Sequence, residues 1–117
     1  MGINVFFMFV YQTMSYLLVT TTTEHQSKAQ EIAKQLIIQK IAACVQIDSI
    51  QSIYTRENKI QNSTEYKLSI KTKESLYDKV ENTIKTLHNY NIPEIIAIPI
   101  THLSQDYAQR IDENTLQ

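Results

Sequence analysis

The sequence is poor in residues that several familiar functional sites require. Its 117 residues include one glycine, Gly2, one cysteine, Cys44, two prolines and no tryptophan. Phosphate-binding loops of the P-loop and dinucleotide types need several glycines for close backbone approach, so both are excluded. A single cysteine cannot form a disulfide within the chain. This excludes a disulfide-stapled secreted scaffold and favours a reducing compartment, the cytoplasm.

The sequence also lacks an excess of charge of either sign. Eleven Lys and Arg residues face 12 Asp and Glu residues, for a formal net charge of -1. Because the basic residues are thinly spread, we expect no nucleic-acid partner. The longest apolar run, near the N-terminus, has about nine residues, too few to span a bilayer, so we expect no membrane partner. The length and the 43% hydrophobic share indicate one ordinary globular domain.

The first thirteen residues differ in composition from the rest. They contain all three phenylalanines, Phe6, Phe7 and Phe9, and no charged side chain, and Met14 follows as a second start. A signal peptide would need a basic segment and a small-residue cleavage site, and neither is present. We therefore expect residues 1–13 to be an extension outside the core, and residues 14–117 to form the domain.

Two segments, residues 43–54 and 66–72, have the alternating pattern of half-buried strands. In the first, the alternation slips near Asp48 and Ser49, which predicts a bulge or bend. The intervening residues 55–65 are polar and predict a connecting loop. An arm of about eleven residues reaches about 35 Å, whereas a sixteen-residue helix covers about 24 Å. The hairpin should therefore extend beyond its helices and present unpaired backbone to a second copy.

The remaining segments complete a recognisable order. Residues 16–21 predict a buried strand, and Thr23 with Gln26 predicts a capping box for a helix that ends near Lys40. Residues 73–88 predict a second helix, and residues 94–101 predict a last strand, which Pro99 restricts to a sheet edge. Ser104 predicts the cap of a short helix over residues 105–113. The order predicts an α+β, ferredoxin-like β-α-β-β-α-β sandwich with a C-terminal helix, a long hairpin and strand order 4-1-3-2.

Several runs along the chain resemble those of the CutA family of divalent-cation tolerance proteins. They are Leu17-Leu18-Val19-Thr20-Thr21, Ile41-Ala42-Ala43-Cys44-Val45, Ser52-Ile53-Tyr54, Lys59-Ile60, Glu65, Ile70-Lys71-Thr72 and the segment from His88 to Ile100. The resemblance implies a ferredoxin-like subunit and a homotrimer built through long hairpins. It also implies a link to copper and other divalent cations, a trimer similar to that of the PII signalling proteins, and no enzyme activity.

The hairpin tip departs from the family pattern. Thr55-Arg56-Glu57-Asn58 stands where the family usually has aromatic residues and a glycine, and Asp48-Ser49-Ile50 stands where it has Pro-Gly. The contacts of the tip should therefore differ from those of the family more than the fold does.

Three residues are candidate metal ligands: Cys44, His88 and Glu94. Thiolate is a soft ligand for copper, but Cys44 also suits a small buried position. His88 at a helix end suits either a ligand or a hydrogen-bonding cap. No His-x-x-x-His or Cys-x-x-Cys spacing brings two ligands together, so a site within one chain is not expected, and a weak site across subunits stays open. We expect no obligatory cofactor, with Cu2+ or another divalent cation as the candidate ligand.

A second set of residues is assigned to a ligand cleft or subunit interface: Tyr54, Lys71, Tyr90 and Pro93. Tyrosines at these spacings also suit a core, and Lys71 also suits the solvated face of a strand.

Three functions are considered. One is a non-enzymatic, trimeric CutA-like protein involved in copper tolerance. The alternative is a PII-like regulatory module that binds a small metabolite or a protein partner at subunit clefts. An acylphosphatase-like hydrolase ranks last, because only Arg56 and Arg110 are available to hold an anion.

Overall fold

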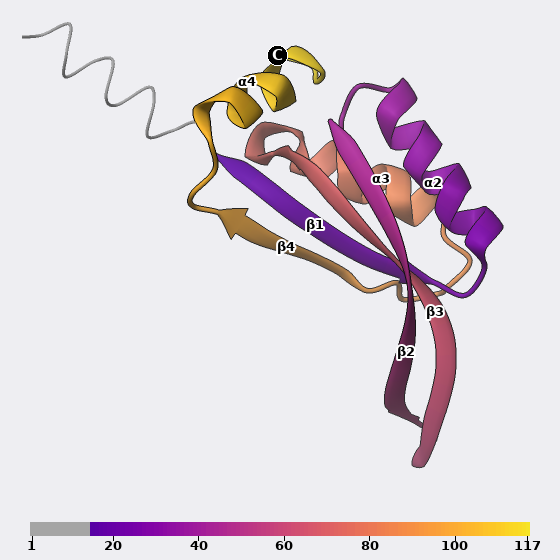
Figure 1. The fold of residues 1–117 in the computed structure, drawn as a ribbon. Helices are drawn as coiled ribbons and strands as arrows, with labels where there is room; N and C mark the ends of the chain where they lie inside the picture. Colours follow the sequence, from indigo (N-terminus) through magenta and orange to yellow (C-terminus); the bar gives the residue numbers. More distant parts are fainter. Residues whose placement is uncertain (1–14) are drawn as a thin grey trace, which may run out of the picture.

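The computed structural model describes residues 15–117, which form a four-stranded antiparallel sheet with three α-helices (Figure 1). The predicted extension, residues 1–13, lies outside the described residues. The elements in chain order are β1 (Tyr16–Thr23), α2 (Gln26–Ile38), β2 (Cys44–Arg56), β3 (Lys59–Lys73), a 3-10 turn (Glu74–Leu76), α3 (Tyr77–Leu87), β4 (Ile95–Ile100) and α4 (Gln105–Glu113).

The sheet has the order β2-β3-β1-β4, which confirms the predicted ferredoxin-like arrangement. Its edges are β2 and β4, as expected. Pro99 lies on β4 opposite Leu17 of β1. This edge position suits a residue that has no N–H to donate to a second neighbour.

Helices α2 and α3 cover the same face of the sheet (Figure 1), and the core lies between them and the strands. Each helix buries one stripe, because apolar residues recur every three or four positions. The buried apolar residues shared by the helices and the sheet are Leu17, Val19, Ala29, Ile32, Leu36, Leu68, Ile70, Val80 and Ile84.

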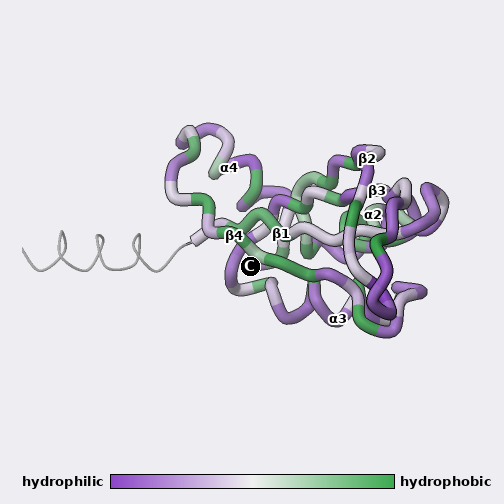
Figure 2. Tube along the Cα trace, turned by 90° about the horizontal axis from the view of Figure 1, so that it is seen from below, coloured by the Kyte–Doolittle hydropathy of each residue, from purple (hydrophilic) through white to green (hydrophobic). Residues whose placement is uncertain are grey.

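The opposite face of the sheet is less covered. Side chains alternate along a strand, so Ile96 and Ile98 of β4 point away from the helices and are 47% and 50% exposed. Figure 2 shows hydrophobic residues along β4. α4 packs at one end of the sheet through buried Ile111, and the hydroxyl of Tyr16 donates to the carboxylate of Asp112 at 3.0 Å.

The predicted capping box of the first helix is wrong. Thr23 belongs to β1, where it pairs with Tyr66, and α2 begins after His25, whose side chain makes no capping hydrogen bond. Pairing with β3 therefore decides the conformation of Thr23. The predicted cap of the last helix is confirmed, because the Ser104 hydroxyl accepts a hydrogen bond from the Tyr107 N–H at 3.1 Å.

The predicted loop over residues 55–65 is also wrong, because most of it is strand. β2 and β3 pair without interruption up to Arg56 and Lys59, so the turn consists of Glu57 and Asn58 alone. Both turn residues have positive φ, 52° and 63°, as a type I′ hairpin turn requires. The long hairpin is therefore longer than predicted.

The register of the hairpin contains no bulge. Cys44 faces Lys71, and each step along β2 is matched by one step along β3 as far as the turn, so of the two predicted alternatives at Asp48 and Ser49, a bulge or a bend, the bulge is wrong. The slip in the pattern has another cause. Val45 and Ile47 are half-buried near the helices, whereas Ile50 and Ser52, on the other face of the strand, are half-buried farther out. The half-buried face of β2 therefore changes at the point where the hairpin extends beyond the helices.

We call residues 50–65 the extended ribbon, because β3 pairs there with β2 alone: its pairing with β1 ends at Tyr66. The ribbon projects from the rest of the sheet (Figure 1). It accounts for dimensions of 61 × 29 × 22 Å and a radius of gyration of 16.7 Å, against about 13 Å for a compact domain of this size. Within residues 15–117, no helix has the length and apolar character to cross a membrane.

Candidate functional site

His88 follows α3 and ties the end of that helix to β1. Its Nε2 atom lies 2.6 Å from the carbonyl oxygen of Thr22, and its Nδ1 atom lies 3.0 Å from the backbone nitrogen of Tyr90. A carbonyl can only accept and an N–H can only donate. The neutral ring therefore carries its proton on Nε2. The Nε2–H group donates to Thr22 and the Nδ1 lone pair accepts from Tyr90, which leaves no ring lone pair for a metal ion.

Tyr90 extends this connection to the hairpin. Its ring centroid lies 4.7 Å from that of His88, and its hydroxyl donates to the Glu65 carboxylate at 2.9 Å. Burial raises the pKa of the Tyr90 hydroxyl, and the hydrogen bond and negative charge of Glu65 raise it further. Tyr90 is therefore a protonated donor at neutral pH, and it holds Glu65 in place.

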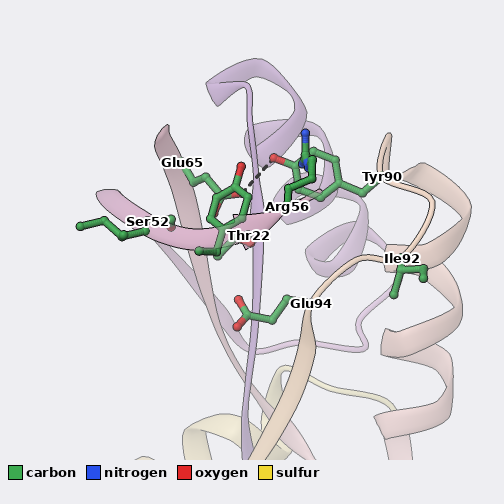
Figure 3. Close-up of a pocket in the computed structure, with 9 residues that line it drawn as sticks. Thr22, Ser52, Arg56, Glu65, Tyr90, Ile92 and Glu94 are labelled. Carbon is green, nitrogen blue, oxygen red and sulfur yellow. Dashed lines mark hydrogen bonds between the residues drawn. The ribbon is translucent and has the colours of Figure 1, made fainter. Parts of the chain in front are cut away.

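These residues form part of a pocket of about 390 Å³ at the angle between the extended ribbon and the segment that leads into β4 (Figure 3). The loop from Tyr90 to Glu94 supplies one wall, and residues of β2 between Ser52 and Arg56 supply the other. The lining residues are Thr22, Ser52, Ile53, Tyr54, Arg56, Glu65, Tyr90, Ile92 and Glu94.

The pocket brings together three charged side chains, Arg56, Glu65 and Glu94. The Arg56 guanidinium lies 5.6 Å from the centroid of the Tyr54 ring, a cation–π arrangement that orients it. No ion pair joins the three charges to one another. Within residues 15–117, the salt bridges are those between Lys28 and Glu31 and between Lys85 and Glu81.

A second cavity, of about 560 Å³, lies between α4 and the ends of β1 and β4. Its one charged lining residue is Asp112, whose two carboxylate oxygens both accept from the Tyr16 hydroxyl at 3.0 Å. This cavity is larger, but its charge is already engaged. The pocket at the ribbon therefore offers more available polar groups for a ligand.

The structure does not bring the three predicted metal ligands together. Cys44 is half-buried on β2 opposite Lys71, Glu94 is exposed in the pocket, and His88 has both nitrogens engaged. Among the residues described, no group of three His, Cys, Asp or Glu side chains is placed to hold a metal ion. A divalent cation thus does not fit these three residues as one site within a single chain.

The predicted cleft residues divide between two places. Tyr54 and Tyr90 line the pocket, and Pro93 is half-buried between the lining residues Ile92 and Glu94. Lys71 lies elsewhere, with its Nζ atom 5.5 Å from the centroid of the Tyr107 ring on α4.

Two charged pocket residues, Arg56 and Glu65, were not predicted as site residues. The sequence pattern places Arg56 in a connecting loop, and it therefore does not show that Arg56 shares a strand face with Ser52 and Tyr54. An uninterrupted alternation from residue 50 to residue 56 would have been the signal, because it places these three side chains on one face.

Comparisons with known proteins agree with this fold. The family model described as CutA1 divalent ion tolerance protein matches residues 17–114. The chain is 37% identical over 92 residues to the divalent-cation tolerance protein CutA of Archaeoglobus fulgidus, covering 79% of this chain and 90% of that protein. It is 33% identical over 105 residues to the chloroplastic protein CutA of Arabidopsis thaliana, covering 89% of this chain. It spans 58% and 59% of the lengths of the Arabidopsis and Oryza sativa relatives.

Solved structures give the same picture. The crystal structure of CutA1 from Oryza sativa matches with a TM-score of 0.86 and 35% identity, over 90% of this chain and 97% of that one. CutA1 from Shewanella sp. SIB1 matches with a TM-score of 0.84 and 38% identity, over 87% and 96%.

Proposed function

Because the chain belongs to the CutA1 divalent ion tolerance family, we propose that it is a non-enzymatic homotrimer that contributes to copper tolerance and binds Cu2+ or another divalent cation weakly. The observation that carries this proposal is the family match over residues 17–114. The match includes all four strands of the sheet, apart from Tyr16, the first residue of β1. The family is named for tolerance to metal ions and not for a catalysed reaction.

The trimer is supported by the extended ribbon. β2 has a neighbour on one side only, so its other side presents unpaired backbone groups over its whole length. A two-stranded hairpin is marginally stable in water by itself. Ile53 and Ile60 of the ribbon are 69% and 82% exposed in the subunit. Packing against other copies of the chain would pair the free backbone of β2, stabilise the hairpin and bury the two isoleucines. The molar mass in solution tests the trimer, and a monomer mass would contradict it.

Weak metal binding is supported by the open carboxylate of Glu94 and opposed by the engaged ring of His88. We expect isothermal titration of the purified protein with CuCl2 to show saturable but weak binding, which Glu94→Gln reduces. Glu113→Gln, on α4, is the matched control. A titration with no saturable heat would remove direct metal binding from the proposal.

A cytoplasmic location is proposed because the single cysteine, Cys44, suits a reducing compartment. Relatives differ in this respect: two plant proteins are named chloroplastic, and a solved Archaeoglobus fulgidus protein is described as periplasmic. Fractionation of cells that express a tagged chain would decide it, and recovery in a secreted or periplasmic fraction would contradict the proposal.

The pocket favours a second function, that of a PII-like regulatory module that binds a small metabolite. The supporting observation is a cavity that holds three charged groups without ion pairs. A thermal-shift screen with nucleotides and small metabolites in the presence of EDTA tests this function separately from metal binding. A screen in which no compound raises the melting temperature would count against it.

A further inference from the structure

The arrangement of charge in the pocket restricts the ligands that it can take. Arg56 comes from the β2 arm of the extended ribbon, Glu65 from its β3 arm and Glu94 from the segment before β4 (Figure 3). Their charges sum to -1, yet none is paired with another. A simple anion attracted by Arg56 would also meet two carboxylates, and a simple cation attracted by the carboxylates would also meet a guanidinium.

Two of the three charged groups are held in position before any ligand arrives. The guanidinium of Arg56 lies over the Tyr54 ring, a contact that leaves its in-plane N–H donors available. Glu65 accepts the Tyr90 hydrogen bond through Oε2, so Oε1 remains available as an acceptor. Tyr90 is itself fixed by the bond from its N–H to His88. Groups oriented in advance lose less entropy on binding.

We propose that this pocket binds a small zwitterion of the amino-acid class, with its ammonium group at Glu65 and Glu94 and its carboxylate at Arg56. The inference rests on the proposed ligand-binding function and specifies its ligand. A cavity of about 390 Å³ lies within the usual range for small-molecule sites, about 300–1,000 Å³. Ile92 supplies apolar surface for the carbon chain between the two charged ends.

A series of ω-amino acids tests the proposal, because it changes only the spacing between ammonium and carboxylate. The probes are glycine, β-alanine, 4-aminobutanoate, 5-aminopentanoate and 6-aminohexanoate, titrated calorimetrically into the full chain in EDTA. Butylamine and butanoate carry one charged end each. We expect one chain length to bind best, and each single-ended probe to bind about tenfold or more weakly, because it loses one charge-assisted interaction.

Substitutions then assign each end of the ligand. Arg56→Gln should lower the affinity for the best-binding amino acid about tenfold, because removing the guanidinium takes away one charge-assisted interaction. The affinity for butylamine should not fall. Glu94→Gln should lower the affinity for both the amino acid and butylamine. Arg110→Gln and Glu113→Gln on α4 are the matched controls and should change neither. The proposal is overturned if no probe binds, if single-ended probes bind as tightly as amino acids, or if the pocket variants behave like the controls. Because EDTA is present throughout, failure here leaves the copper titration unaffected, and failure of that titration leaves this result unaffected.

Discussion

The base of the sheet and the extended ribbon are parts of the same two strands, but they are stabilised differently. In the base, Leu68 and Ile70 of β3 are fully buried beneath the two long helices. In the ribbon, the same strand carries Ile60 with 82% of its surface exposed. The pairing of β2 with β3 continues unchanged between the two regions, but β3 pairs with β1 in the base only. The base therefore has both a second paired neighbour and the apolar area that the subunit can bury by itself.

That difference predicts that equal truncations have unequal effects. Leu68→Ala should lower the free energy of unfolding by about 2–5 kcal/mol, because it opens a cavity in the core. Ile60→Ala should cost no more than about 0.5 kcal/mol in a separated subunit, where its side chain already meets water. Urea denaturation over a range of protein concentrations measures both. Losses of equal size that do not depend on concentration would contradict the distinction.

Two buried threonines on neighbouring strands refine the description of the base. Thr21 and Thr72 are both 0% exposed, but the Thr72 hydroxyl donates to the Ile41 carbonyl at 2.6 Å, whereas the Thr21 hydroxyl has no partner among the residues described. Thr21→Val should raise the free energy of unfolding by about 1 kcal/mol, and Thr72→Val should lower it by about 1–3 kcal/mol. Thermal denaturation of the pair checks this. If both variants shifted in the same direction, the hydrogen-bond assignment would be wrong.

The turn of the ribbon is strained in a way that substitution can relieve. Glu57 and Asn58 have positive φ, which costs a side-chain-bearing residue about 1–2 kcal/mol, least for Asn. Replacing the pair by Asn-Gly, the preferred type I′ sequence, should stabilise the ribbon by about 0.5–1 kcal/mol.

Amide hydrogen exchange at Arg56 and Lys59, the hydrogen-bonded pair that flanks the two-residue turn, would show this as slower exchange. Glu57→Pro is the opposite control, because proline fixes φ near -65° and should open the turn. Slower exchange in the proline variant would contradict the turn assignment.

The smallest expected effect concerns the contact between ribbon and base at Tyr90. Its pKa in the folded state is raised above the ordinary value of 10.0 by burial, with smaller contributions from Glu65, Glu24 and Tyr54. The folded state therefore holds this proton more tightly than the unfolded state. Stability should be constant below about pH 10 and fall above it, as the unfolded chain begins to lose the proton first.

Comparison of Tyr90→Phe with the parent chain isolates this contribution, because phenylalanine has no proton to lose. Denaturation at pH 8 to 11 should show a shallower alkaline decline for Tyr90→Phe, and an unchanged decline for the control Tyr107→Phe. Parallel curves for all three proteins would contradict the assignment.

The sequence predicted the base well because its pattern reflects burial. Alternation from Tyr66 to Thr72, the stripes of the two long helices and the cap at Ser104 each result from local contacts that the structure retains. The sequence pattern does not predict the outer half of β3, because Asn62 and Ser63 are typical of loops. Pairing with β2, and not intrinsic preference, makes these residues strand. The turn at Glu57 and Asn58 contains no glycine, so the sequence pattern does not predict its position.

The candidate site was predictable only in part for the same reason. Tyr54 and Tyr90, predicted as cleft or interface residues, and Glu94, predicted as a metal ligand, line the same pocket. Arg56 and Glu65 reach it only through the register and curvature of the ribbon, which depend on contacts distant in sequence. The role of His88 remained open between ligand and hydrogen-bonding group, and its two short contacts favour the second.

The uninterrupted register of the long hairpin also limits how its length can evolve. Inserting one residue into a single arm would turn every later side chain of that arm to the opposite face. Arg56 and Tyr54 would then leave the pocket together. Viable length variants should therefore add or remove residues in both arms at once and in even steps, so that the hairpin lengthens or shortens in units of one strand repeat.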